Sequence, residues 1–425
     1  MEGLGPNAQM LNPHRHGTLL DMYTALSPAS SISQRDLDIA VKTRSNLLAW
    51  NGQFSPQLVH SLISAYAPAR ATVLDPFAGS ATVASESIAL GHSFLGFEVN
   101  PAAFILGSLY ALAQFDVAHR KEVLSEADDA IDALLAGRVA TNSLIDIELV
   151  QGLVWTRRRS SNLVVASVLM NALRSAESAR VEELRRARDR VHALVMGLPL
   201  TARTVAVRLG DARATGLADG CCDLVITSPP YINVFNYHQQ YRPVVEALGC
   251  RPLNVAVSEI GANRKHRQNR FLTVIQYCLD IGASVAEMFR TCKKGGRVVM
   301  IVGRESAVLG VPFRNGDLVV EVVLRAFGIE LALRQERKFI NRFGQLIYED
   351  ILHFDPMPVD YSELAQGAAR AVALESLHSG LIYVDQKSIS LLRSACLNAA
   401  DVKLSPLFRT AEGVIPAVLC NRRTQ

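Results

Sequence analysis

The chain has 425 residues, 49% of them hydrophobic, so it is long enough and apolar enough for one large domain with a subdomain, or for two domains. Its net charge of +4 and pI near 8.7 favour an anionic partner only weakly. The seven cysteines form no C-x-x-C pair, which argues against a metal centre. Their odd number, without a signal peptide, predicts reduced thiols in the cytoplasm. No uncharged run is long enough to span a bilayer, so no membrane partner is expected.

The first part of the chain, residues 1–45, is polar and mixed, and we interpret it as an N-terminal extension of loops without recognisable chemistry. A helix is predicted to begin at Ser55–Pro56, with serine at the N-cap and proline in the first turn. The apolar residues at helical spacing that form its predicted buried face are Leu58, Leu62, Ile63 and Tyr66.

Residues 71–98 have the pattern of a strand, a glycine-bearing loop, a helix and a second strand. The strands are predicted over 71–74 and 93–97, and the helix over 82–90 with Gly91 at its C′ position. Gly79 permits close approach of the backbone to a ligand, and Glu98 follows at about the twenty-residue spacing of an acid that binds a ribose diol. The alternative is an ordinary βαβ unit, with Gly79 as a turn and Glu98 as a solvated strand end.

A long helical stretch follows this unit. An apolar helix is predicted over 101–112, and helical spacing continues over 123–135 and 161–196, ending at Gly197 and Pro199. Because the stretch is long for a crossover, we interpret residues 116–201 as a helical insertion. Its arginines form either a solvated face with salt bridges to neighbouring acids or a face that contacts phosphates, and they are Arg157, Arg158, Arg159, Arg185, Arg186, Arg188 and Arg190.

The chain then returns to the sheet with strands predicted over 204–209, ending at Gly210–Asp211, and over 222–226. The second strand delivers Ser228, Pro229, Pro230 and Tyr231 to its carboxyl end, where open α/β sheets bind ligands. Prolines cannot continue a central strand, so this segment predicts a rigid turn that presents a hydroxyl, the Pro229 carbonyl and an aromatic face. Two acceptors and a ring suit a planar base with an exocyclic amine, although a plain turn is the alternative.

Aromatic and basic residues alternate after this turn, which favours a nucleic-acid-facing loop over a plain solvated one. The candidates for DNA contact are Tyr237, Arg242, Arg264, Lys265 and Arg267. Further elements are predicted as helices over 271–289 and 318–327, a strand over 297–302, and a last antiparallel pair over 330–333 and 347–354. Residues 356–425 carry no readable motif, but 364–377 and 388–397 have helical patterns.

Two of these segments together resemble the amino-group DNA methyltransferases, which use S-adenosylmethionine to methylate an exocyclic amine of cytosine or adenine. Asp75-Pro-Phe-Ala-Gly-Ser80 is similar to the family's cofactor loop, and Thr227-Ser-Pro-Pro-Tyr231 to its catalytic motif. Supporting matches are Trp50 to Pro56, which resembles the segment over the methionine end of the cofactor, the stretch from 233 to 249, and the closing hairpin at 337–340 and 348–354.

The resemblance implies an α/β, Rossmann-like methyltransferase fold, with a mostly parallel seven-stranded sheet, an antiparallel last strand and the helical insertion. It implies a methyltransferase domain over 46–115 and 202–355, with residues 356–425 as a C-terminal extension. Asp211 matches the position of an acid that holds the adenine amine, and an N-cap residue is the alternative. The cofactor-binding residues that it implies are Trp50, Phe54, Pro56, Asp75, Pro76, Phe77, Gly79, Ser80, Glu98 and Asp211.

One position departs from the family, which usually has glycine where this chain has Ala81. An alanine held at positive φ would cost of order 1 kcal/mol. We expect instead that position 81 has helical dihedrals in the first turn of the helix, where alanine is favourable.

The resemblance also implies a mechanism. Ser228 Oγ and the Pro229 carbonyl would accept the amine protons, Pro230 would hold the turn rigid, and Tyr231 would stack on a base flipped out of the duplex. Serine at the first position favours N4 of cytosine over N6 of adenine. A restriction–modification role with a partner endonuclease is expected, and the alternatives are an RNA guanine-amine methyltransferase, a non-catalytic DNA-binding protein, and a small-molecule or protein methyltransferase.

Overall fold

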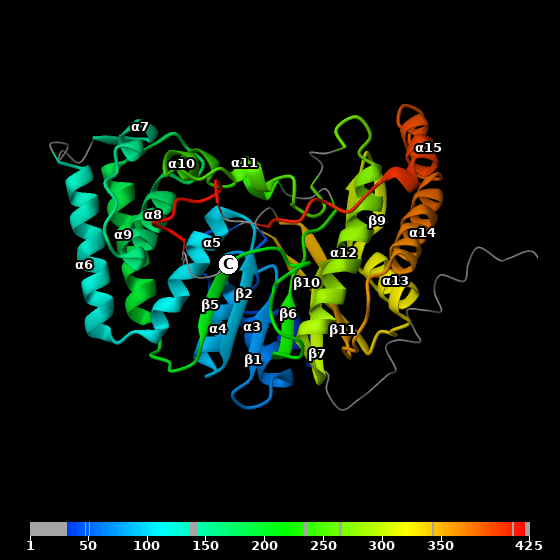
Figure 1. Cartoon of the computed structure of the whole chain (residues 1–425), viewed down its shortest axis with the longest axis horizontal. Helices are drawn as coiled ribbons and strands as arrows, with labels where there is room; N and C mark the ends of the chain where they lie inside the picture. The colour runs from blue at the N-terminus through cyan, green and yellow to red at the C-terminus, as the bar shows by residue number, and fades with distance from the viewer. Residues whose placement is uncertain are drawn as a thin grey trace, which may run out of the picture.

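The computed structural model describes residues 32–46, 48–50, 52–136, 143–232, 236–262, 266–341, 344–409 and 412–420. Its centre is a seven-stranded sheet with helices on both faces (Figure 1). In spatial order the strands are β10 (Leu333–Ile340), β11 (Leu346–Phe354), β7 (Cys292–Gly303), β6 (Cys222–Thr227), β1 (Thr72–Asp75), β2 (Ser93–Glu98) and β5 (Val205–Leu209).

Neighbouring strands from β7 to β5 run parallel, whereas β11 is antiparallel to both β7 and β10. The predicted fold class, a mostly parallel seven-stranded sheet whose last strand is antiparallel, is therefore confirmed. The carboxyl ends of β1, β2, β5 and β6 lie at one edge of the sheet, which is where a doubly wound fold binds its ligands.

Both faces of the sheet are buried, because successive residues along a strand point to opposite sides. Leu224 and Ile226 of β6 belong to one apolar core and Val225 to the other. The first core is covered by α3 (Pro56–Tyr66), α4 (Thr82–Ala89) and α5 (Pro101–Ser108), which the 3-10 helix η2 (Leu109–Gln114) continues. The second is covered by α12 (Leu272–Thr291), α13 (Asn315–Phe327), α14 (Glu363–Gly380) and α15 (Ile389–Leu397).

Three further helices lie beside β5 and α5, at the left of Figure 1: α6 (Val117–Leu134), α8 (Arg159–Leu173) and α9 (Val181–Gly197). The short α7 (Ile147–Gln151) and a pair of three-residue strands, β3 (Leu144–Asp146) and β4 (Ser178–Arg180), connect them. Arg120 of α6 is buried and donates hydrogen bonds to the carbonyls of Leu112 and Ala113, which ties the start of α6 to the end of η2. The arginine therefore anchors the helical stretch to the sheet domain.

The C-terminal segment crosses the carboxyl edge of the sheet, from α15 toward α8 (Figure 1). Its start is held by Gln276 of α12, which donates to the Lys403 carbonyl. Its end is held by Arg159 of α8, which donates to the Leu419 carbonyl. Residues 403–409 and 412–419 thus lie beside the end of the sheet where the predicted ligand sites are.

One sequence-based boundary is corrected by the structure. The strand predicted over 330–333 is β10, which begins only at Leu333 and runs to Ile340. It lies at the edge of the sheet and buries little apolar surface, so its sequence lacks the apolar run of an inner strand. Of the described helices, α12 alone is long and apolar enough to cross a membrane, and it is mostly buried inside the fold.

Candidate active site

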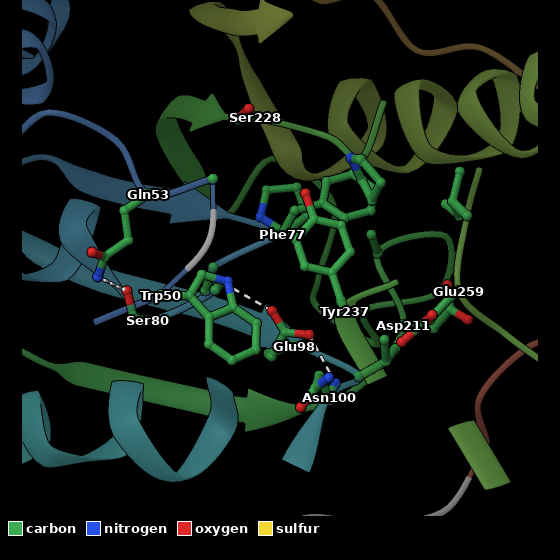
Figure 2. A pocket seen from close by; sticks show the side chains of 18 of the residues that line it. Trp50, Gln53, Phe77, Ser80, Glu98, Asn100, Asp211, Ser228, Tyr237 and Glu259 are labelled. Atoms are coloured by element: carbon green, nitrogen blue, oxygen red, sulfur yellow. Dashed lines mark hydrogen bonds between the residues drawn. The ribbon is translucent and has the colours of Figure 1, made fainter. Parts of the chain in front are cut away.

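A pocket opens at the carboxyl ends of β1, β2, β5 and β6, and it joins the segments that the sequence singled out (Figure 2). Among the predicted residues, its lining contains Trp50, Phe54, Pro76, Phe77, Gly79, Ser80, Glu98, Asp211, Ser228, Pro230 and Tyr237. The predicted residues Pro56, Asp75, Pro229 and Tyr231 are outside this lining.

The loop after β1 approaches the pocket with two left-handed residues, Gly79 and Ala81, that are separated by Ser80. Gly79 has φ +51°, a conformation that glycine adopts without steric cost. Ala81 has φ +63° and ψ +45° at the N-cap of α4, so the expectation of helical dihedrals at this position is wrong. Its methyl group is fully buried, and a Cβ built on Gly107 of α5 would lie only 3.1 Å from it. The glycine at 107 therefore provides the space that the alanine at 81 fills.

Glu98 stands at the end of β2, in the middle of the pocket. One carboxylate oxygen accepts the Gly79 N–H at 2.9 Å and the other accepts the Asn100 N–H at 2.8 Å. Burial raises the pKa of Glu98 to about 7, although these two hydrogen bonds act to lower it. Each oxygen keeps one further acceptor position, as binding of two ribose hydroxyls requires.

Asp75 does not face the pocket but connects its two halves. It is buried at the end of β1, and its Oδ1 accepts the Thr227 hydroxyl at 2.6 Å and the Phe77 N–H at 3.1 Å. Desolvation raises the pKa of Asp75 to about 7. Since Thr227 immediately precedes Ser228, this carboxyl group fixes the predicted catalytic turn relative to the predicted cofactor loop.

The segment before α3 closes one side of the pocket with aromatic stacking. The Trp50 ring stacks with Tyr237 and with Tyr241, each at 6.3 Å between ring centroids. The Tyr241 hydroxyl also donates to the Ala49 carbonyl at 2.6 Å, and Gln53 donates to the Ser80 hydroxyl. Residues 50–54 are thus held against the loop after β1 and against the stretch that follows the catalytic turn.

Asp211 lines the pocket but is already saturated by donors from the protein. Its Oδ1 accepts from Arg213 N and Nε, and its Oδ2 accepts from Arg213 Nη2 and from the backbone N–H of Phe408 at 2.9 Å. A carboxylate offers about four acceptor positions, and all four are used. Arg213 also binds Asp280 at 2.7 Å, so the group is a buried cluster of one arginine and two acids.

The turn after β6 presents Ser228 and Pro230 to the pocket. The Ser228 hydroxyl lies 3.1 Å from the Tyr231 hydroxyl. The Tyr231 ring packs against Gly303, where a Cβ would come within 3.0 Å of it. Burial raises the pKa of Glu349, while Arg337, 3.4 Å away, acts to lower it.

Sequence reasoning missed several polar residues of the pocket, among them Gln53, Asn100 and Glu259. Gln53 lies inside a recognised segment, and Asn100 is recognisable as the N-cap before Pro101. Glu259 stands in no motif. The Asn100 Nδ2 and Glu259 Oε1 atoms are buried without a hydrogen-bond partner, so the pocket offers one unused donor and one unused acceptor. With Glu98 and the apolar Val99 and Ile260, this donor set fits a nucleoside.

The residues predicted to contact DNA are dispersed. Tyr237 lines the pocket beside Trp50, Arg242 pairs with Glu246 at 2.8 Å, and Arg267 is exposed. Arg264 and Lys265 lie outside the described residues. In the helical stretch, Arg186 pairs with Glu182, Arg188 with Asp128 and Asp132, and Arg158 with Glu122 and Glu126, the pattern of a salt-bridged helix face.

The strand order, the glycine-bearing loop after β1 and the acid at the end of β2 are those of the Rossmann-like methyltransferase fold. Residues 28–106 match the model of the family described as DNA methylase, of the N6/N4 class. This match agrees with the family that the motifs within these residues resemble. No curated protein matches the chain.

Solved methyltransferases give weak matches. A SAM-dependent methyltransferase from Methanosarcina mazei is 12% identical, with 70% of this chain and 97% of that chain covered and a TM-score of 0.33. TrmN from Thermus thermophilus is 14% identical, with 72% of this chain and 50% of that chain covered and a TM-score of 0.31. The rRNA methyltransferase aviRa from Streptomyces viridochromogenes is 12% identical over 81% and 96%, with a TM-score of 0.30. Scores this low leave the substrate to be argued from this chain's own residues.

Proposed function

We propose that this methyltransferase modifies the exocyclic amine of a flipped-out base in DNA, and that the base is cytosine, methylated at N4. The observation that carries the proposal is the Asp75–Thr227 hydrogen bond of 2.6 Å. It fixes the Ser-Pro-Pro-Tyr turn beside the loop for the cofactor, so that Ser228 and Glu98 line one pocket. A base amine and a methyl donor can therefore be held in contact there.

When bound, S-adenosylmethionine supplies a methyl group on a positively charged sulfur. Glu98 would bind the ribose hydroxyls, and Trp50, Phe54 and Phe77 would cover the ligand with apolar surface. The Ser228 hydroxyl and the Pro229 carbonyl would accept hydrogen bonds from the two amine N–H groups, which directs the nitrogen lone pair toward the methyl group. The surplus proton of the methylated amine would then leave to solvent. Orientation of this kind supplies much of the acceleration without a covalent intermediate.

The contact of Tyr231 with Glu349 gives the Ser228 hydroxyl a direction. We propose that the Tyr231 hydroxyl donates toward the Glu349 carboxyl and that its oxygen accepts a hydrogen bond from the Ser228 hydroxyl, 3.1 Å away. The lone pairs of Ser228 are then free to accept from the amine. Tyr231 thus orients the serine, and this role differs from the stacking role that the motif implies.

The preference for cytosine rests on serine at the first position of the motif, and N6 of adenine is the second candidate. A restriction–modification role is part of the proposal because the family model is that of a DNA methylase. The decisive experiment incubates the protein and labelled S-adenosylmethionine with unmethylated genomic DNA, and in parallel with transfer RNA, and then analyses the nucleosides. N4-methylcytosine supports the proposal, and N6-methyladenine corrects the base. Label in RNA alone, or in neither nucleic acid, contradicts it.

The Ser228→Ala variant tests the assigned acceptor. We expect methyl transfer to fall about 100-fold or more, because an oriented acceptor is lost, while the affinity for S-adenosylhomocysteine changes less than about twofold. Ser379→Ala on the exposed face of α14 is the control. An equal loss of affinity and turnover would show that Ser228 acts in ligand binding and not in catalysis.

A further inference from the structure

Two acids stand near the end of the pocket that is formed by β5 and the loop before α12. Asp211 follows β5, and Glu259 lies between Ser258 and Ile260 (Figure 2). The family resemblance assigns the adenine amine to an acid at the position of Asp211. In this chain Arg213 and the Phe408 N–H occupy all acceptor positions of that carboxylate. An adenine amine could bind it only by displacing one of these donors from a buried ion cluster.

Glu259, in contrast to Asp211, has a carboxylate oxygen that accepts no hydrogen bond. Its Oε2 lies 2.8 Å from His238 Nδ1, and both side chains are buried. Its Oε1 is buried without any hydrogen-bond partner, although the residue lines the pocket. A buried acceptor without a donor costs stability, and a ligand that donates to it recovers that cost.

The surroundings of Glu259 indicate which donor would bind. Val99, Ala212 and Ile260 give this end of the pocket an apolar lining suited to a planar ring. The proposed function places the ribose hydroxyls at Glu98, whose carboxylate is held by the Gly79 and Asn100 N–H groups. The adenine ring carries a single donor group, its exocyclic amine, so this amine is the group left to pair with Glu259.

We infer that Glu259, and not Asp211, accepts the adenine amine of the cofactor. The inference rests on S-adenosylmethionine as the cofactor. His238 holds the carboxylate by one oxygen, and the other oxygen faces the ligand. Since Tyr237 stacks on Trp50 while the adjacent His238 bonds Glu259, the segment after the catalytic turn contacts both sides of the cofactor pocket.

The test measures binding by calorimetry, with S-adenosylhomocysteine and with its analogue that has hydrogen in place of the amine. The wild-type protein should prefer the amine-bearing ligand by about 10- to 100-fold, as expected for a hydrogen bond to a charged acceptor. Glu259→Leu should reduce this preference below about threefold, because no acceptor remains. Glu259→Gln keeps an acceptor oxygen and should retain an intermediate preference.

Asp211→Asn is the matched control. Circular dichroism establishes how much of this variant is folded, and the folded protein should prefer S-adenosylhomocysteine over the analogue without the amine as strongly as the wild-type protein does. The inference is overturned if Glu259→Leu keeps the wild-type preference or if Asp211→Asn alone abolishes it. If Glu259→Leu does not fold, an unchanged preference in Glu259→Gln together with loss in Asp211→Asn overturns it. Failure of the wild-type protein to bind S-adenosylhomocysteine at all would instead contradict the cofactor, which separates the two failures.

Discussion

The pocket has two walls that are built in different ways. The first wall consists of residues 50–54, 76–82 and 98–100, and backbone geometry dominates it: left-handed residues at 79 and 81, and N–H groups that bind Glu98. The second wall consists of residues 210–212 and 258–260, and it depends on buried charges, since Arg213 binds Asp211 and Asp280. The difference teaches that one pocket can combine a wall fixed by local conformation with a wall fixed by distant side chains.

Among the predicted effects, the largest is the loss of stability when Arg213 is removed from the second wall. Arg213→Met leaves Asp211 and Asp280 buried without a counter-charge, so the free energy of unfolding should fall by about 3–5 kcal/mol. Urea denaturation measures the change. Arg186→Met on α9, whose side chain is 66% exposed, is the control and should change stability by less than about 0.5 kcal/mol. Equal effects of the two variants would remove the distinction between the walls.

The first wall should be more sensitive to pH through Glu98. Its folded-state pKa of about 7 lies above the usual value of 4.5, so the folded protein holds this proton more tightly than the unfolded chain. The resulting stability is present below pH 4.5 and is lost as the pH rises to about 7. Between pH 4.5 and 8, the ligand-free wild-type protein should therefore lose about 3 kcal/mol more than Glu98→Gln, since each unit of the shift corresponds to about 1.4 kcal/mol.

Denaturation curves at several pH values measure this difference. Glu182→Gln, on the exposed face of α9, is the matched control and should follow the wild-type profile. If the Glu98→Gln profile is equally steep, the carboxyl is ionised throughout this range and burial does not govern its titration.

The smallest expected effect concerns the fit of Ala81 against Gly107. Gly107→Ala should destabilise the protein by about 1–2 kcal/mol, because its new methyl group would lie 3.1 Å from that of Ala81. In an Ala81→Gly background the penalty should shrink, with a coupling of at least about 0.5 kcal/mol in a double-mutant cycle. Gly197→Ala is the control, since no atom lies within 4 Å of its added Cβ. Additive effects would show that the two positions do not share one space.

The sequence predicts the first wall well because its determinants are close together in the chain. A strand, a loop glycine, a helix and a strand-end acid within residues 71–98 suffice to place Gly79 and Glu98 in one site. The family's usual glycine at position 81 is the signal for a left-handed residue there, whereas the helical propensity of alanine favoured the expectation that the structure overturns.

The second wall is outside the reach of such reasoning. Asp280 is 67 residues from Arg213 and Phe408 is 197 residues from Asp211, and no pattern in the chain connects them. Glu259 likewise has no motif around it, and its position depends on where the loop before α12 folds. The predicted position of Asp211 in the pocket agrees with the structure, but its state of saturation depends on partners that only the tertiary fold brings together.

The segment over the carboxyl edge of the sheet has a consequence for synthesis in the cell. Asp211 receives its last donor from the Phe408 N–H, 197 residues later in the chain. At ribosomal rates of about 5–20 residues per second, this separation corresponds to roughly 10–40 s. The first wall can therefore form well before the second, because the second is complete only after residue 408 has been synthesised. We expect the complete cofactor pocket to form late in translation.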